Sequence, residues 1–315
     1  MKYNIAVYDM YAGDEIDGYY ILKDAFGKTT AAGKAYLSGM ISDRSGSIDV
    51  KFWDYTGPVS EADAGKVVKV HGQVSEYKGA LQVILSNIRI AKETDDYDLS
   101  ELVPVAPIDV DATMDEVADF IASIEDIDYR HVAEVMFERH KDAFRKIPAA
   151  KSVHHSFVSG LLMHTTNMLR TADFLSGLYS GVIDRSLLLT GTLLHDFAKE
   201  KEFVFSDLGI VKDYSVAGDL LGHLVMGAME IAEVCKAENI PENKSLLLQH
   251  MLLSHHGEPE RGAALRPVCA EAELLSYIDA IDSRMEIYEE TFLDVPKGEF
   301  SDRVFALEKK IYNHD

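Results

Sequence analysis

The sequence contains little cysteine and no long run of apolar residues. Its 315 residues include only two cysteines, Cys235 and Cys269, both in apolar segments of helical character, so we expect free thiols rather than a disulfide or a metal site. No stretch stays apolar over the roughly 20 residues that a membrane-spanning helix needs. The first residues also lack the basic flank and apolar core of a secretory signal. We therefore expect a cytoplasmic protein with no membrane partner.

Basic residues are scarce as well. The chain has 31 lysines and arginines against 53 acidic residues, a formal net charge of −22. Broad, non-specific binding of nucleic acid needs many cations to neutralise phosphates, so this composition argues against it for the chain as a whole. The imbalance is uneven, because residues 1–93 hold 11 basic and 12 acidic residues, leaving 20 basic against 41 acidic for the rest. Contact with a polyanion should use the first segment or a local site.

Residues 1–93 have the pattern of a small β-barrel. Five segments rich in β-branched and aromatic residues are separated by turns, several of which contain glycine. In one segment, Ile48, Val50 and Phe52 alternate with outward-facing residues that include Trp53, so the first three are predicted to face inward. Strands are predicted at 19–26, 34–42, 48–54, 66–77 and 80–90, a pattern typical of an OB-fold.

A linker and a helical region follow the predicted barrel. Residues 94–112 are acidic and include Pro104 and Pro107, which predicts a linker. Apolar residues then recur with helical spacing, and Thr113 with Glu116 matches a capping box at the start. Helices are predicted at 129–145, 156–178, 185–199, 215–236, 243–254, 270–291 and 301–312. The fold class is therefore multidomain β + α: a five-stranded barrel at 1–93, a linker at 94–112 and an all-α bundle at 113–315.

Histidines are concentrated in the helical region. Eight of the 12 lie between residues 154 and 256, one or two per predicted helix, and carboxylates follow on a later helix. Helices that each direct an imidazole towards one interior point build a metal site in a bundle. A single histidine is more often an ordinary core or surface residue, but several buried imidazoles are costly to desolvate without a metal or a charge partner. We therefore expect His164, His195, Asp196 and Asp279 to bind metal.

These residues carry a resemblance to a known family. A lone histidine, a His-Asp pair and a distal aspartate resemble the HD-domain metal-dependent phosphohydrolases, and HDFAK at 195–199 matches the HDxxK form. The segments KTTAAGKAYLSGMISDRSGSIDVKFWD, VHHSFVSGLLMHT, LLHDFAK, GHLVMG and LSHHGEPERG follow one another as in the bacterial YhaM-type 3'-5' exoribonucleases, to which the sequence is similar over nearly its whole length. The resemblance implies an OB-fold ahead of an HD-domain bundle.

The resemblance also implies a site with two divalent metal ions. The first ion would be held by His164, His195, Asp196 and Asp279. Asp196 would bridge to a second ion held by His223 and His255. His256 would be either a further ligand or a residue that contacts a ligand without binding the metal. Manganese is the ion we expect first, with cobalt, iron, nickel, zinc and magnesium as alternatives, because imidazole and carboxylate suit several metals.

Several further residues are candidates for substrate contact or for positioning. The HDxxK form implies that Lys199 contacts a non-bridging phosphate oxygen, whereas the alternative is a surface lysine at a helix end. His154, His155 and Arg261 fit either substrate contact or a structural role. Asp282, one helical turn after Asp279, either orients a ligand or is a solvated carboxylate.

The predicted barrel offers an aromatic and basic outer face. If the alternation holds, Trp53 and Lys51 on one strand lie beside Tyr36 and Lys34 on the next. Stacking on such rings contributes about 1 to 3 kcal/mol per base with little dependence on sequence, which suits single-stranded RNA, with single-stranded DNA as a second candidate. The alternative is that these aromatic residues belong to the core.

Three hypotheses of function remain open. The first is a metal-dependent 3'-5' exoribonuclease that releases nucleoside monophosphates. The second is an HD-domain phosphohydrolase of a small or cyclic nucleotide, in which the barrel is a regulatory or oligomerisation element; the segment HHGEPERG lacks the GYP-type continuation associated with hydrolysis of cyclic dinucleotides. The third is a non-catalytic binding protein, against which the intact ligand set argues. A homo-oligomer is left open.

Overall fold

The computed structural model describes residues 2–30, 32–92, 94–150, 157–206 and 208–314. By its internal contacts the chain forms two compact units, one that contains residues 1–105 and one that contains residues 106–205 and 209–315. The segment predicted as a linker includes the short helix α1, Leu99–Leu102, and the first residues of α2. The boundaries predicted at residues 93 and 113 stay a prediction.

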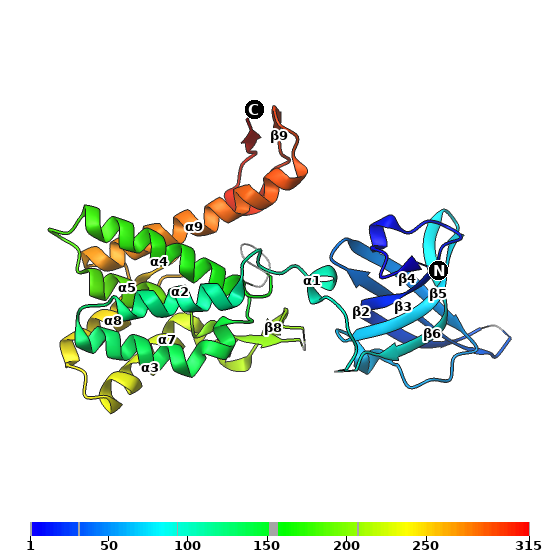
Figure 1. Cartoon of the computed structure of the whole chain (residues 1–315), viewed down its shortest axis with the longest axis horizontal. Coiled ribbons are helices and arrows are strands. Elements are labelled where there is room, and N and C mark those ends of the chain that lie inside the picture. Colours follow the sequence, from blue (N-terminus) through cyan, green and yellow to red (C-terminus); the bar gives the residue numbers. More distant parts are fainter. Residues whose placement is uncertain (1, 31, 93, 151–156, 207, 315) are drawn as a thin grey trace. The chain divides into compact units, whose positions relative to one another are not determined.

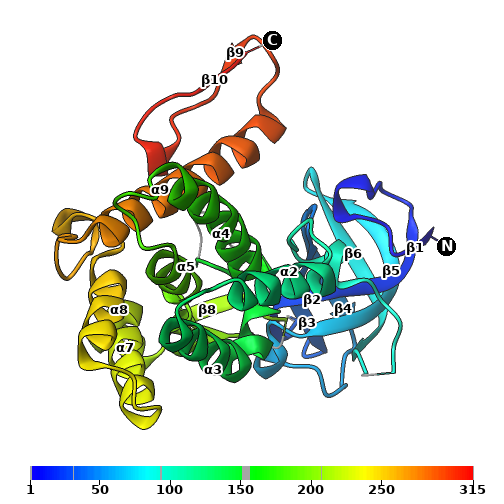
Figure 2. The same ribbon diagram turned by 60° about the vertical axis from the view of Figure 1, so that its left-hand side comes forward.

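The first unit is a closed barrel (Figures 1 and 2). Antiparallel pairing joins β2 to β3, β3 to β4 and β6 to β5, whereas β4 and β6 are parallel. Pairing of β5 back to β2 closes the barrel, and the two-residue strand β1 runs parallel to β2. The elements are β1 (Lys2–Tyr3), η1 (Val7–Asp9), β2 (Glu15–Thr29), β3 (Ala35–Asp43), β4 (Gly46–Trp53), η2 (Glu61–Asp63), β5 (Val67–Tyr77) and β6 (Ala80–Ile90).

Alternation along β4 places its apolar residues as predicted. Ile48 and Val50 are buried, Phe52 is partly buried against the same barrel core, and Trp53 is 48% exposed. Close curvature of the barrel requires Gly39 on β3, because a Cβ there would lie 2.2 Å from the carbonyl oxygen of Asp24, next to a bulge in β2. The barrel therefore has one filled interior and a separate outer face.

The second unit is a helical bundle built around one apolar core. Its central helices pack as α4 on α5 and α9, and as α8 on α5, α7 and α9. Its elements are α2 (Val110–Ala122), α3 (Ile127–Phe144), α4 (Gly160–Leu178), α5 (Arg185–Leu194), α6 (Lys199–Glu202), β7 (Phe203–Phe205), β8 (Val211–Tyr214), α7 (Val216–Ala237), α8 (Glu242–Ser254), η3 (Pro259–Arg261), α9 (Ala270–Asp294), β9 (Glu299–Phe300), η4 (Phe305–Leu307) and β10 (Tyr312–Asn313). The bundle is therefore helical with small β-hairpins, β7–β8 and β9–β10, that the sequence did not predict.

The predicted capping box at Thr113 is wrong. Helix α2 begins three residues earlier, at Val110, and the side chain of Asp109 caps it by accepting a hydrogen bond from the amide of Ala112. Thr113 lies inside the helix, buried, and its hydroxyl donates to the carbonyl of Asp109. Asp109 follows Pro107 closely, so the extended backbone after the proline leads directly into the cap.

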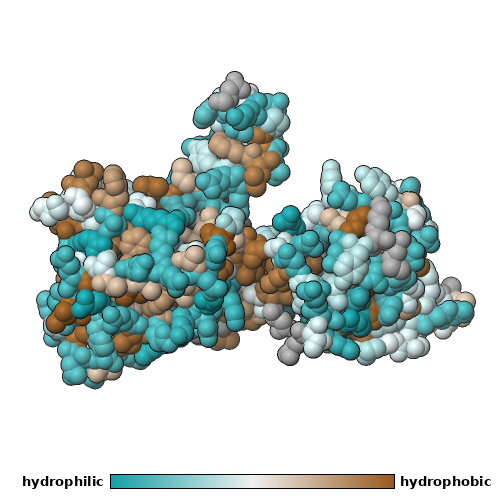
Figure 3. All heavy atoms as spheres, in the orientation of Figure 1, coloured by the Kyte–Doolittle hydropathy of each residue, from teal (hydrophilic) through white to brown (hydrophobic). Residues whose placement is uncertain are grey.

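The predicted helix at 301–312 is also wrong. This segment forms the turn η4 between β9 and β10 at the end of α9, which Figure 1 shows projecting beyond the other helices. Leu307 and Ile311 are buried against Ile287 of α9. Figure 3 shows hydrophobic residues gathered on this projecting part of the chain. The two apolar residues have helical spacing in the sequence, but they contact α9 from an irregular backbone. Packing against α9 therefore overrides the local preference for a helix.

A buried network of charges joins α3 to α7. The carboxylate of Glu230 lies 3.0 Å from His140 Nε2 and 3.0 Å from Arg139, and Lys201 contacts its other oxygen. Burial alone would raise the pKa of Glu230, but hydrogen bonds from His140, Lys201 and Arg139 lower it to about 2. Burial would likewise lower the pKa of His140, but Glu200 and Glu230 raise it.

We expect Glu230→Gln to lower the free energy of unfolding by about 1–3 kcal/mol, because the buried imidazole of His140 loses its charged acceptor. A carboxylate with a lowered pKa stabilises the fold above about pH 4.5, and that contribution is lost as the pH falls towards about 2. The His140 contribution is complete below about pH 6.5 and is lost as the pH rises through its raised pKa. The difference between variant and wild type in the free energy of unfolding, measured with urea, should therefore be largest between about pH 4.5 and pH 6.5. Glu233→Gln, on the exposed face of α7, is the control; equal losses in both variants would contradict the prediction.

Both cysteines are free, with Cys235 buried and Cys269 partly buried, as predicted. Among the residues that the structure describes, none of the helices combines the length and apolar character needed to cross a bilayer.

Candidate metal centre

Residues from five parts of the helical unit meet at one point. His164 comes from α4, His195 and Asp196 from the turn that follows α5, His223 from α7, His255 from the end of α8, and Asp279 from α9. Two groups of candidate ligands have atoms within 4.8 Å of one another: His164 with His195 and Asp196, and His223 with His255 and His256. The predicted ligands, which are separated by more than 100 residues in sequence, are therefore brought together.

Each central imidazole is held through its Nδ1 atom. His164 Nδ1 lies 2.7 Å from the carboxylate of Asp282, and His223 Nδ1 lies 2.9 Å from that of Glu202. His195 and His255 direct Nδ1 to the carbonyls of Thr192 and Leu252, each at 2.8 Å. Acceptors of this kind fix the proton on Nδ1, which leaves Nε2 of all four rings as the ligand atom.

Asp196 lies between the two histidine groups. Its Oδ2 is 3.3 Å from His195 Nε2, and its Oδ1 is 3.3 Å from His223 Nε2 and 3.6 Å from His255 Nε2. On the first side, His164 Nε2 lies 3.3 Å from His195 Nε2 and 3.4 Å from Asp279. One carboxylate therefore presents a separate oxygen to each group, which is the arrangement of a bridging ligand.

The unsatisfied atoms of the site, which lie on the side of His223, His255 and His256, fit a divalent metal ion. Within the described part of the chain, Asp196 Oδ1, His223 Nε2, His255 Nε2 and His256 Nδ1 are buried and have no hydrogen-bond partner. Leaving four such atoms unpaired would be costly, whereas each is a good ligand for a divalent ion. Burial lowers the pKa of His255 and of His256, so both imidazoles are neutral and able to coordinate. The donor set thus suits nitrogen- and oxygen-liganded divalent metals.

Lys199 is buried beside Asp196. Helix α5 ends at Leu194 rather than at residue 199, and a turn in which the Lys199 amide donates to the Asp196 carbonyl leads into α6. The ammonium group lies 2.5 Å from Asp196 Oδ2, and its side chain is 10% exposed. Burial alone would raise the pKa of Asp196, but the charges of Lys199 and His195 lower it well below its usual value. The alternative of a surface lysine is therefore wrong, while contact with phosphate stays a prediction.

The sequence did not reveal Glu202 as part of the site. Its carboxylate accepts from both the amide and Nδ1 of His223, at 3.1 and 2.9 Å. Gly222 has φ 70° within α7, a conformation that suits glycine, and this break immediately precedes His223. Glu202 belongs to the charged run KEKE, which is more typical of a solvated surface. Asp282, for which two roles were open, orients His164.

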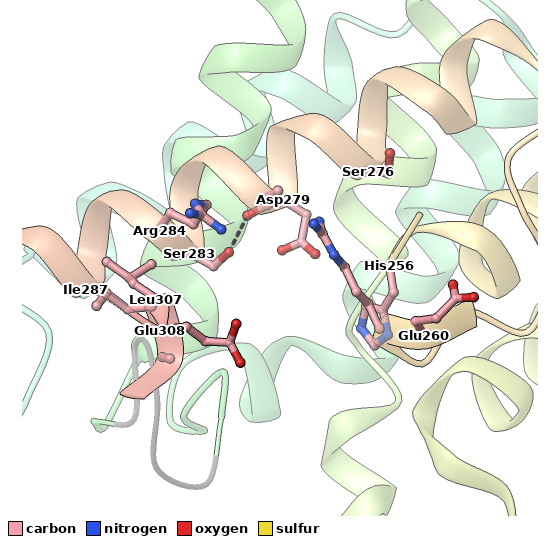
Figure 4. A pocket seen from close by; sticks show the side chains of 12 residues that line it. His256, Glu260, Ser276, Asp279, Ser283, Arg284, Ile287, Leu307 and Glu308 are labelled. Atoms are coloured by element: carbon pink, nitrogen blue, oxygen red, sulfur yellow. Dashed lines mark hydrogen bonds between the residues drawn. The ribbon is translucent and has the colours of Figure 1, made fainter. Parts of the chain in front are cut away.

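A cavity of about 740 Å³ adjoins the ligand groups (Figure 4). His256 and Asp279 lie on its wall, and so does Arg261, one of the predicted substrate contacts. Arg284, which the sequence did not suggest, lines the same cavity from α9. The predicted contacts His154 and His155 lie outside the described residues. The cavity thus gives a ligand access to the metal-binding side chains.

The predicted aromatic pair of the barrel forms on its outer face. Tyr36 and Trp53 are direct partners on β3 and β4, with ring centroids 4.9 Å apart. Lys51 is partly buried and its ammonium donates to the Ser38 hydroxyl on β3. Both strands belong to the face that OB-folds use for oligonucleotides. The alternative of core aromatic residues is wrong for Trp53, whereas binding of nucleic acid stays a prediction.

Comparison with known proteins matches both units. The HD domain family matches residues 162–284, and an OB-fold nucleic acid binding domain family matches residues 28–91. The chain is 34% identical over 301 residues to the 3'-5' exoribonuclease YhaM of Bacillus subtilis strain 168, and 35% identical over 302 residues to that of Bacillus licheniformis. Each alignment covers 95% of this chain and 95% of the relative, which confirms the predicted OB-fold barrel followed by an HD-domain bundle. This chain therefore belongs to the YhaM 3'-5' exoribonuclease family.

Proposed function

We propose that this protein is a metal-dependent 3'-5' exoribonuclease that hydrolyses single-stranded RNA to nucleoside monophosphates. The observation that carries the proposal is the position of Asp196, whose two oxygens face two separate histidine groups at 3.3 Å. Family membership supplies the direction of attack and the RNA substrate. Residues 113–315 would carry the chemistry and residues 1–93 would bind the strand.

His164, His195, Asp196 and Asp279 would hold one divalent ion, and Asp196, His223 and His255 would hold the other. His256 Nδ1 is buried and unpaired among the described residues, so it is a further ligand candidate. Two ions so held supply an activated water and neutralise charge on the phosphate. We expect manganese first, since the nitrogen and oxygen donors accept it as they do cobalt, iron, nickel, zinc and magnesium.

The chain's own residues provide positioning and charge. The ammonium of Lys199 lies next to Asp196 and would contact a non-bridging phosphate oxygen as negative charge grows there. Glu202 and Asp282 keep the imidazoles of His223 and His164 in the orientation that the site needs. The guanidinium of Arg261 would hold a phosphate at the cavity.

The direct test uses a 5'-labelled single-stranded RNA and the manganese-loaded protein. A ladder that shortens from the 3' end is expected, with nucleoside monophosphates as products, and the same assay with single-stranded DNA measures sugar preference. Intact RNA together with turnover of small or cyclic nucleotides would reject the proposal in favour of a small-molecule phosphohydrolase.

We expect Trp53→Ala to raise the concentration of long single-stranded RNA needed for half-maximal rate by about 5- to 100-fold, because one stacking platform contributes about 1–3 kcal/mol. Hydrolysis of a dinucleotide, which has no further bases to stack on the barrel, should not change. Tyr77→Ala removes another exposed ring, beside the β5–β6 turn, and serves as the control. If Trp53→Ala leaves the RNA concentration for half-maximal rate unchanged, this face of the barrel does not bind the RNA as proposed.

A further inference from the structure

The cavity next to the metal-binding groups has one wall outside the HD domain. His256 and Asp279 line it on one side, and Leu307 and Glu308 line it on another. The HD domain family matches only residues 162–284. The turn around Glu308 therefore lies outside the segment that supplies the metal-binding side chains. The cavity that it lines is large enough for a nucleotide.

This added wall is fixed in place. Leu307 is 7% exposed and packs with Ile287 of α9 and with Ile311. The Val304 amide donates to the Lys309 carbonyl at 2.9 Å, which closes the turn. Because α9 also carries Asp279, the turn holds a constant position relative to the metal-binding side chains.

Glu308 presents its carboxylate to the cavity from an unusual backbone. Its φ is 55° and its ψ 19°, the left-handed region that glycine and asparagine adopt more readily than glutamate. Among the described residues, no hydrogen bond or ion pair occupies the carboxylate, and Figure 4 shows it turned into the cavity. A ligand atom that donates a hydrogen bond would satisfy this carboxylate.

Two cations line the same cavity. Arg261 lies on η3 and Arg284 on α9, and within the described chain neither guanidinium group is engaged in a hydrogen bond or an ion pair. Ser276 and Ser283 add hydroxyl groups to the wall. Guanidinium groups suit phosphate and a carboxylate accepts from a hydroxyl, so the cavity complements a nucleotide that carries a phosphate and a free sugar hydroxyl.

We propose that this cavity binds the 3'-terminal nucleotide of the substrate and that Glu308 accepts a hydrogen bond from its free 3'-hydroxyl. The inference rests on the proposed exonuclease function, in which that nucleotide lies just beyond the bond that is cut. A 3'-phosphate offers no comparable donor and carries about −1.5 to −2 charges at neutral pH, so the carboxylate repels it. The enzyme therefore selects ends with a free 3'-hydroxyl.

Glu308→Gln keeps the size of the side chain and removes its charge. The test compares the rates at which two 5'-labelled RNAs of one sequence are shortened, one ending in a 3'-hydroxyl and one in a 3'-phosphate. Wild type should prefer the hydroxyl end by about 100-fold or more and the variant by less than about 10-fold, given the strength of a hydrogen bond to a charged acceptor. Glu299→Gln, exposed on β9 and not on this cavity wall, should keep the wild-type preference.

Calorimetry separates this inference from the exonuclease activity. In manganese buffer, wild type should bind adenosine 5'-monophosphate at least about tenfold more tightly than adenosine 3',5'-bisphosphate, and Glu308→Gln should reduce that preference. Wild type that shortens neither RNA but keeps the binding preference would reject the exonuclease and support hydroxyl recognition by Glu308. Equal use of both RNA ends by wild type, or an unchanged preference in Glu308→Gln, would overturn the inference and leave the exonuclease proposal standing.

Discussion

Replacing Asp196 with alanine is expected to lower the rate of RNA hydrolysis by at least about 1,000-fold. Asp196 faces both histidine groups, 3.3 Å from His195 Nε2 through Oδ2 and 3.3 Å from His223 Nε2 through Oδ1. In the proposed two-metal site, its removal would take a ligand from both ions at once. Metal stabilisation of the transition state contributes several kcal/mol, and each 1.36 kcal/mol is a factor of ten, so the loss is large.

Single-turnover shortening of labelled RNA measures this rate, metal analysis measures the bound ions, and circular dichroism measures helix content. Because Lys199 would lose its partner in Asp196→Ala, Asp196→Asn is a second variant that keeps a hydrogen-bond acceptor beside it. Asp142→Ala, which removes an exposed carboxylate on α3, should retain rate and metal. Hydrolysis near the wild-type rate in either Asp196 variant would contradict the two-metal mechanism.

Replacing Lys199 with methionine is expected to lower kcat by about 100- to 1,000-fold, the loss typical when one donor to a developing charge is removed. The Lys199 ammonium is buried beside Asp196, so water screens its charge less than it would at the surface. The KM for RNA should change much less, because the contact grows stronger only in the transition state.

Metal content distinguishes this role from a structural one. Lys199→Met removes a cation that competes for Asp196, so the variant should bind at least as much manganese as wild type. Lys236→Met, at the exposed end of α7, is the matched control and should leave kcat unchanged. Loss of bound manganese in parallel with activity would show that Lys199 only maintains the ligand geometry.

Local patterns were sufficient to predict the elements that carry the site. Apolar alternation identified β4 and its outward Trp53, and helical spacing with one or two histidines per helix identified the segments that meet at the metal centre. These signals are strong because the side-chain periods of strand and helix are fixed by backbone geometry. The bridging position of Asp196 was implied by the family resemblance rather than by spacing.

Other residues could not be predicted because their roles depend on contacts between distant segments. Glu202 lies in a charged run, yet its carboxylate is buried against His223, which is 21 positions later. Glu308 lies in a segment with helical apolar spacing, but packing of Leu307 against α9 turns the chain there and directs Glu308 into the cavity. In both cases burial and partner come from tertiary packing, which a local pattern does not record.

The sequence by itself determined the two-part architecture, the set of imidazoles and carboxylates, and the family, since periodicity and residue type are local properties of the chain. The tertiary structure alone decided how those groups face one another: the Nδ1 acceptors of four histidines, the buried contact of Lys199 with Asp196, and the wall formed by residues 306–308. Orientation depends on which helices pack together and on which groups lose water, and those are properties of the folded whole.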